Sequence, residues 1–363
     1  MQIIEEIINN DNILEGCSEL QKTCLDKLQK NPLPNNKSEL WRIANKSKLA
    51  KFLNYKLSDS FHEPSIPSIK ESKDVIRLII GQSKKINIKG KGWEIKELND
   101  KEIINLIKKN IADCKTTENW SNILNHFLTN KKNICSLNIS GKNIPHLEII
   151  TNSKTDLFHS KTLILNIEKQ TNVVISQISL GDENSSLSNS SYLYLGEDSQ
   201  VNHGIISYGK NKSYIINSLN VFQNKNSEYN LGSLQFKFDF ARLEININQI
   251  EGNAKTNIKG MQITQDNEQI STYAKIAFNG PNGFLDQLNK SLATDRSHSV
   301  FEGLIVVPQI AQKTDASQLS RNLLLSNHAK IDTKPQLEII ADDVKCMHGA
   351  TISQLNENEL FYM

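Results

Sequence analysis

A two-residue alternation of apolar and polar side chains dominates the chain from Ile134 to about Val344. Leu243, Ile245 and Ile247, for example, alternate with charged and amide side chains. Phe236, Phe238 and Phe240 likewise alternate with Lys237 and Asp239. In a β-strand this period places one set of side chains inside the protein and the other set outside. No helical pattern of typical length interrupts the region. We therefore expect an all-β structure of short strands that follow one another along the chain.

Three all-β architectures fit this pattern: a sandwich, a barrel and a solenoid. The strand region is too long for a typical single sandwich. Asn is frequent at its corners, as in residues 181–186 and 223–227, where an Asn side chain can bond the neighbouring backbone. These features favour a β-helix (solenoid). The last coil of a β-helix leaves an unpaired strand edge, which must be capped or matched to another chain.

The chain before residue 130 has mainly helical spacing, with apolar residues three and four positions apart. The predicted elements are helices over residues 3–28, 39–53 and 100–127, the second with Ser38 as its N-cap, and a short strand over residues 75–80. We therefore expect two domains. Residues 1–130 form a mostly helical region with a few short strands, and residues 131–363 form the β-helix core.

Composition and charge narrow the classes of function. The 42 basic and 40 acidic side chains leave a formal charge of +2, which is too small to hold nucleic acid or an anionic membrane by charge alone. The sequence has no run of about 18 apolar residues, and its N-terminus lacks the basic-then-apolar layout of a secretory signal. Five scattered cysteines argue for a reducing compartment rather than a disulfide framework. We therefore expect a cytoplasmic protein.

Cys346 and His348 are the most specific pair of candidate site residues. If their segment forms a strand, both side chains project to the same face. A thiolate beside an imidazole can coordinate iron or zinc, and the imidazole could instead activate the thiolate. By themselves, however, these residues favour ordinary packing, because free cysteines are commonly buried and no second Cys/His pair completes a metal site.

The other candidate motifs favour structural roles. Asp342 and Asp343 are adjacent, so a strand would point them to opposite faces, and at a turn they would cap backbone donors rather than flank a glycosidic bond. A basic segment over residues 84–93 could contact RNA, but Glu94 dilutes its charge, which favours a solvated strand face. The chain contains no P-loop and no hydrolase signature. We therefore assign no catalytic residue and expect no enzyme; any nucleotide hydrolysis would come from a partner.

The last part of the sequence carries a series of linked motifs. They are, in order, Ala-Gln-Lys-Thr-Asp-Ala-Ser-Gln at 311–318, Arg-Asn-Leu-Leu-Leu-Ser at 321–326, Lys-Pro-Gln-Leu-Glu-Ile at 334–339, Ala-Asp-Asp-Val-Lys-Cys at 341–346, His-Gly-Ala-Thr at 348–351 and Leu-Phe-Tyr at 360–362. Their order and spacing resemble the SufB/SufD family of iron–sulfur cluster assembly scaffolds, and linked motifs are far more specific than one short motif. Within this family the chain resembles SufD. No cysteine lies near Arg321 and Asn322, where SufB carries its cluster-building cysteine.

The resemblance implies a right-handed parallel β-helix flanked by helical elements. It also implies a non-catalytic scaffold that forms a heterodimer with a SufB-like subunit through the C-terminal part of the β-helix. In the family, the histidine of the Cys-x-His motif lies at that interface, opposite a SufB cysteine, where the nascent Fe–S cluster forms. The residue that matches it here is His348, and Cys346 is a weaker candidate. The isolated chain would bind no cofactor, and the complex could use a flavin.

The sequence departs from the family in two places. The family docks a SufC-like ATPase through a helical segment after the Leu-Phe-Tyr motif, but this chain stops at Met363, so we expect that segment to be missing or truncated. Residues 279–283 also differ from the family's histidine-bearing segment. Two alternatives remain open: a β-helical carbohydrate-active enzyme, and a SufB-like subunit that carries the cluster itself.

Overall fold

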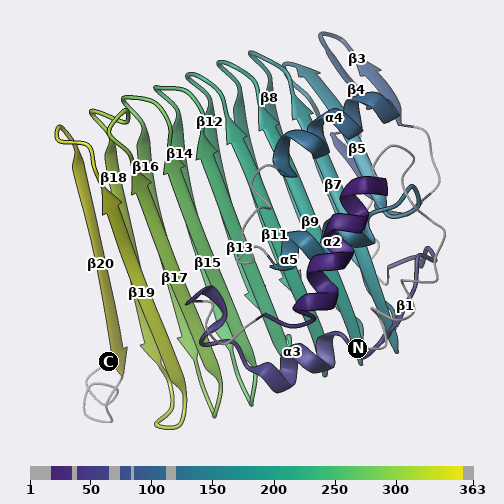
Figure 1. Ribbon diagram of the computed structural model, residues 1–363, viewed down its shortest axis with the longest axis vertical. Helices are drawn as coiled ribbons and strands as arrows, with labels where there is room; N and C mark the ends of the chain where they lie inside the picture. Colours follow the sequence, from purple (N-terminus) through teal and green to yellow (C-terminus); the bar gives the residue numbers. More distant parts are fainter. Residues whose placement is uncertain (1–17, 35–38, 65–73, 83–85, 112–119, 355–363) are drawn as a thin grey trace.

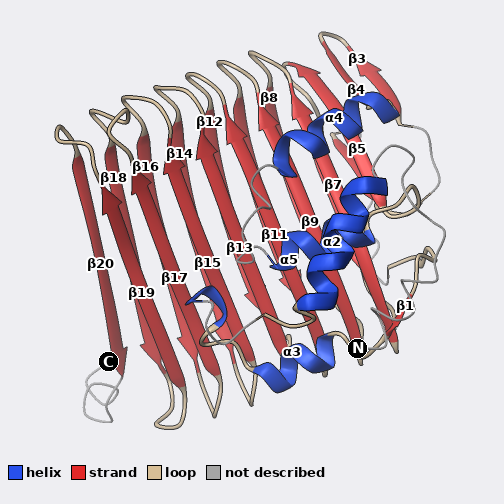
Figure 2. Cartoon of the chain, viewed as in Figure 1, coloured by secondary structure: helices blue, strands red, loops and turns tan. Residues whose placement is uncertain are grey.

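Residues 18–34, 39–64, 74–82, 86–111 and 120–354 are described by the computed structural model of the chain. Its strands stack into two long sheets, with successive strands alternating between them (Figures 1 and 2). Sheet A contains β3 (Asn87–Gly90), β4 (Trp93–Glu97), β5 (Ile134–Gly141), β7 (Leu157–Ile167), β9 (Ser185–Leu195), β11 (Ser213–Gln223), β13 (Phe240–Gln249), β15 (Gln269–Phe278), β17 (His298–Val307) and β19 (Lys330–Ile339), with β1 (Lys56–Leu57) beside β7.

Sheet B contains β2 (Val75–Ile79), β6 (His146–Asn152), β8 (Asn172–Leu180), β10 (Gln200–Tyr208), β12 (Glu228–Phe236), β14 (Lys255–Thr264), β16 (Phe284–Ala293), β18 (Asp315–Leu324) and β20 (Lys345–Gln354). From β5 to β20 every strand pairs in parallel with the strand one coil away, as between β16 and β18. This arrangement confirms the prediction of a mainly β solenoid. The predicted short strand near residue 75 is also confirmed, as β2.

The corners between strands explain why short polar segments interrupt the alternation of apolar and polar residues. Asp198, Asn226 and Asp295 adopt positive φ angles of 56°, 57° and 56°, a conformation that Asn and Asp tolerate better than most residues. One apparent strand in the sequence is such a corner. The alternation of Phe236 and Phe240 spans the end of β12 and the start of β13, and Lys237 turns the chain between them with a φ of 61°.

Between the two sheets lies a core of Leu, Ile and Val side chains that runs the length of the solenoid. Buried amide and hydroxyl side chains complete it by bonding from one coil to the next. Asn189, for example, donates through Nδ2 to Asn217 Oδ1 at 2.9 Å, and Gln262 Nε2 donates to Ser291 Oγ at 3.2 Å. A parallel ladder sets equivalent side chains about 4.8 Å apart, so polar residues of successive coils satisfy one another.

The helices before residue 130 cover part of the outer face of sheet A (Figure 2). They are α2 (Ser18–Lys30), the 3₁₀ turn η1 (Glu39–Trp41), α3 (Lys46–Phe52), α4 (Asp100–Ile111) and α5 (Trp120–Leu128). Trp41 and Trp120 pack edge to face at 5.5 Å in a core that includes Tyr214 of sheet A. None of the described helices is long and apolar enough to cross a membrane.

The N-terminal region differs in detail from the helices that the sequence predicts. The segment after Glu39 is a 3₁₀ turn followed by a separate helix, α3, because Asn45 caps α3 by accepting from the Lys48 N–H at 3.1 Å. The predicted cap Ser38 lies outside the described residues, as do most of the first predicted helix and residues 112–119, between α4 and α5.

Candidate functional site

The final coil leaves both sheets open. β19 pairs with β17 and β20 pairs with β18, and no other described strand borders either of them (Figure 1, yellow end). In a parallel ladder, successive residues send their N–H and C=O groups to opposite sides. Lys345 donates to Thr314 O at 2.8 Å, so Cys346, His348 and Ile352 direct their backbone groups to the free edge.

Cys346 and His348 both lie on the inner face of β20. Their register partners on β18 are Ala316 and Gln318, which are fully buried between the sheets. His348 is nevertheless exposed, because no described coil follows to cover it. The imidazole therefore lies on the interior row of the solenoid and is accessible at its open end.

The Cys346 thiol lies in a different environment from the imidazole. It is half-buried and packs against the end of the long core. Burial raises its pKa, the nearby Asp315 carboxylate raises it further, and the backbone of Ala316 opposes them. The thiol is therefore protonated at neutral pH, which makes it a poor nucleophile and a poor metal ligand in the isolated chain.

Exposed hydrophobic side chains gather at the same end of the molecule. Ile340 is 68 % exposed, Met347 61 % and Ile352 46 %. Ile352 lies on the inner row, where its register partner Asn322 is buried. A coil or a partner stacked on β20 would cover the Ile352 side chain. Exposed apolar side chains that gather at one end of a protein are typical of interaction sites.

Within the described ranges, no three His, Cys, Asp or Glu side chains come together as a metal site. Asp342 and Asp343 lie in the corner between β19 and β20 and are exposed. The Asp342 carboxylate accepts from the side-chain amide of Gln309 at 3.0 Å, and the Asp343 N–H donates to the side chain of Gln312. Asp342 therefore serves the corner through its carboxylate and Asp343 through its backbone N–H; within the described residues neither carboxylate is seen to cap a backbone donor, contrary to what the sequence suggested.

The basic segment predicted near residue 90 lies on the β3–β4 hairpin. Lys89 pairs with Glu94 at 2.8 Å; the Lys89 side chain is exposed and that of Glu94 is half-buried. The ion pair supports a solvated strand face for these two residues. Lys84 and Lys85 lie outside the described residues.

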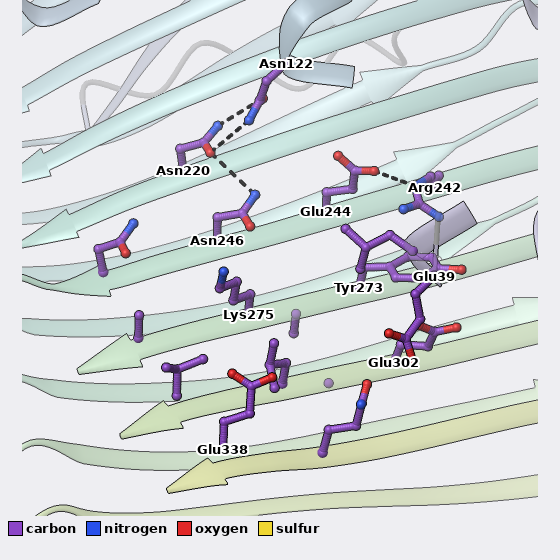
Figure 3. A pocket seen from close by; sticks show the side chains of 18 of the residues that line it. Glu39, Asn122, Asn220, Arg242, Glu244, Asn246, Tyr273, Lys275, Glu302 and Glu338 are labelled. Atoms are coloured by element: carbon purple, nitrogen blue, oxygen red, sulfur yellow. Dashed lines mark hydrogen bonds and ion pairs between the residues drawn. The ribbon is translucent and has the colours of Figure 1, made fainter. Parts of the chain in front are cut away.

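A groove of about 550 Å³ lies on the outer face of sheet A beside η1 and α5 (Figure 3). Arg242 forms one end of it, stacked 3.7 Å from the ring centroid of Trp41 and 3.5 Å from that of Tyr273. Arg242 also pairs with Glu244 at 2.5 Å. Burial raises the pKa of Glu302, which lines the same groove. Sequence reasoning missed this groove, because it joins residues from η1 to β19.

The groove does not fit a flavin dinucleotide. A pyrophosphate binds to unpaired cations or to the N–H groups at a helix N-terminus. Arg242 is already paired with the carboxylate of Glu244. The lining also contains the carboxylates of Glu302 and Glu338, and Lys275 is its one lysine among the described residues. We therefore assign no flavin to this groove.

These observations define a parallel β-solenoid protein whose distinctive chemical groups lie on its last coil. The chain belongs to the SufBD family: the family model described as "SUF system FeS cluster assembly, SufBD core domain" matches residues 149–363, more than half of the chain. This match confirms the resemblance drawn from the C-terminal motifs, and it does not favour a carbohydrate-active enzyme.

Relatives of the chain include proteins named for iron–sulfur cluster assembly. An iron–sulfur cluster assembly SufBD family protein of Synechocystis is 40% identical over 173 residues, which cover 48% of this chain and 38% of the relative. The iron–sulfur cluster assembly protein SufD of Escherichia coli is 42% identical over 118 residues, 32% of this chain and 27% of that protein. The SufD protein of Plasmodium berghei is 32% identical over 217 residues, 58% of this chain and 16% of that protein. The matched segments therefore span less than two fifths of the length of each of these relatives.

Proposed function

We propose that this chain is a non-catalytic scaffold subunit of iron–sulfur cluster assembly that pairs with a SufB-like subunit through its final coil. The observation that carries the proposal is the open end of the solenoid, where the exposed His348 lies on the inner row beside unpaired strand edges. A second β-solenoid docked there would complete the hydrogen bonding of β20. It would also cover exposed side chains such as Met347 and Ile352.

The nascent Fe–S cluster is the cargo of this interface. A neutral imidazole is a good ligand for iron, so His348 supplies one donor, and the partner supplies the thiolates. Cys346 is the weaker candidate because its raised pKa keeps the thiol protonated. A ligand set divided between two chains agrees with the lack of a three-residue metal cluster in the described part of this one.

Other components of the complex follow from the family resemblance. The sequence contains no P-loop, so ATP hydrolysis would come from a SufC-like ATPase. A flavin, if the complex uses one, would bind outside the groove beside Arg242. The scattered cysteines suit a reducing compartment, either the cytoplasm or a plastid.

The test is His348→Ala, with His328→Ala as a matched control, because His328 is an exposed histidine in the corner before β19. Each variant is co-purified with a SufB-like subunit, and the complex is reconstituted anaerobically with iron and sulfide. We expect His348→Ala to fold and pair normally but to lower the cluster absorbance several-fold, and His328→Ala to behave as wild type. Near-normal cluster yield from the His348→Ala complex would refute the role of His348.

Cys346→Ser separates packing from ligation at the neighbouring position. If Cys346 only packs, the variant lowers the melting temperature slightly and leaves the cluster yield unchanged. A large loss of cluster without a change in stability would instead assign the thiol to the ligand set.

A further inference from the structure

We infer that Gln318 positions the imidazole of His348 by accepting a hydrogen bond from its ring N–H. The inference rests on the proposed role of His348 and extends it to a residue one coil deeper. Gln318 lies on the inner face of β18, directly below His348 in the parallel register. Its part in the site follows from three observations.

The first observation is that the Gln318 amide is held in one orientation. Its side chain is fully buried, and Nε2 donates to Gln287 Oε1 of the preceding coil at 2.9 Å. Gly303 of sheet A lies opposite it. A Cβ at Gly303 would lie 2.3 Å from Nε2 and 2.7 Å from Oε1, so the amide fills the space that this glycine leaves. The hydrogen bond to Gln287 and the packing against Gly303 together fix the plane of the Gln318 amide.

The second observation is that the carbonyl oxygen of this amide has no partner. Oε1 of Gln318 is buried and accepts no hydrogen bond within the described residues. A buried acceptor without a donor is unfavourable, because its lost hydrogen bonds to water are not replaced, so we expect a donor to reach this atom. Because Nε2 is directed to Gln287 in the coil before, the trigonal amide directs Oε1 away from that coil, toward the final one.

The third observation is that the next position on this row is the imidazole. Neighbouring strands lie about 4.8 Å apart, so inward side chains at paired positions are in reach of one another. A neutral imidazole has one N–H donor and one nitrogen with a lone pair. No interaction of the His348 ring is seen within the described residues. The ring N–H of His348 and the unpaired Oε1 of Gln318 therefore belong to paired positions on neighbouring strands.

The consequence concerns which nitrogen of His348 can bind iron. If one ring nitrogen donates to Gln318, the imidazole is fixed in one tautomer, and its other nitrogen presents a lone pair to the open end of the solenoid. Histidine ligands of metals are commonly oriented in this way by an acceptor behind them. Gln318 is therefore a positioning residue that acts through His348.

The test uses the full chain labelled with ¹⁵N at histidine, at a pH about two units above the ordinary imidazole pKa of ~6.5. His348→Ala identifies the His348 signals. We expect the two ring nitrogens of His348 to give widely separated ¹⁵N shifts in the wild-type chain, as one tautomer does. Averaged shifts in the wild-type chain would by themselves overturn the inference.

Two variants attack the proposed hydrogen bond in different ways. Gln318→Met keeps the side-chain length and removes the acceptor, whereas Gly303→Ala displaces the amide and leaves both partners chemically intact. In either variant the ¹⁵N shifts of the two His348 ring nitrogens should approach each other, because the two tautomers then interconvert. Gln235→Met is the matched control, because it makes the same change at a buried inward glutamine of β12, away from the open end. It should leave the His348 signals unchanged.

Cluster reconstitution with the SufB-like partner separates this inference from the proposed function. If Gln318→Met gives averaged ¹⁵N shifts and also lowers cluster yield several-fold, both the positioning role of Gln318 and the ligand role of His348 are supported. If the tautomers average but neither Gln318→Met nor His348→Ala lowers the yield, Gln318 positions the ring and the ligand role of His348 is wrong. If the shifts of Gln318→Met match those of the wild type, the positioning inference fails whatever the cluster yield.

Discussion

The guanidinium of Arg242 lies 3.7 Å from the ring centroid of Trp41, although 200 residues of sequence separate them. Trp41 belongs to η1 and is fully buried, and Arg242 belongs to β13 in the middle of sheet A. The contact joins the helical region to the solenoid through one cation–π pair, which is stronger when both partners are shielded from water. The helical region is therefore packed against the solenoid as part of its structure.

Trp41→Ala should destabilise the protein by about 3–5 kcal/mol, the usual range for deleting a buried aromatic side chain. The loss includes the edge-to-face contact with Trp120 and leaves the Arg242 side chain poorly covered. Chemical denaturation followed by circular dichroism measures the change. Phe61→Ala is a suitable control, since Phe61 is 37 % exposed and its loss should cost little. Similar stabilities for Trp41→Ala and the wild type would contradict the packing described here.

The stability of the protein should fall as the pH is lowered from about 6.5 to 4, in part because of His126. Burial lowers the pKa of this histidine to about 4. In that window the unfolded chain binds a proton that the folded chain excludes, so stability decreases with falling pH. The pKa difference corresponds to about 3 kcal/mol. The slope of the unfolding free energy against pH reports the number of protons bound on unfolding, and His126→Gln should lower that number by about one in this window. Equal slopes for the variant and the wild type would show the assignment to His126 to be wrong.

Ile352→Asp should abolish pairing with a SufB-like subunit and leave the fold intact. The substitution places a carboxylate on the inner row of the open coil, where docking of a partner would bury it at a cost of several kcal/mol. Val174→Asp is the matched control, because Val174 is 45 % exposed, against 46 % for Ile352, and lies on β8 away from the open end. Co-purification decides the question: equal retention of the partner by both variants would argue against an interface at the final coil.

Pro335 should protect the free edge of β19 from pairing with other chains. Lys330 donates to Ser297 O at 2.9 Å and Ile340 donates to Val307 O at 2.8 Å, so even-numbered residues of β19 face β17. The missing N–H of Pro335 therefore falls on the outer edge, where proline blunts strand addition.

Pro335→Ala restores a donor at this edge and should increase self-association of the isolated chain several-fold. Light scattering over a range of concentrations measures the effect, with circular dichroism to check the fold. A Pro335→Ala chain that stays as dispersed as the wild type would show that the proline does not guard the edge.

Much of the fold could be predicted from local pattern. The alternation at Leu243, Ile245 and Ile247 predicted the strand that the structure shows as β13, because side-chain direction in a strand depends only on sequence parity. The same rule predicted a shared face for Cys346 and His348. Local pattern failed where a corner preserved the alternation, as at Phe236 and Phe240, since hydrophobicity alone does not report the positive φ of Lys237.

The sequence by itself determined the β character of the region after residue 130, the helical character of the region before it and the family, through motifs that are read locally. Only the tertiary structure decided which residues share a row. Asn189 and Asn217 are 28 residues apart, whereas Gln287 and Gln318 are 31 apart, because the corners differ in length. Because the period of the repeat is not constant, the sequence alone does not predict which residues of successive coils are paired. The exposure of His348 and the unpaired oxygen of Gln318 beneath it therefore appear only when the coils are stacked.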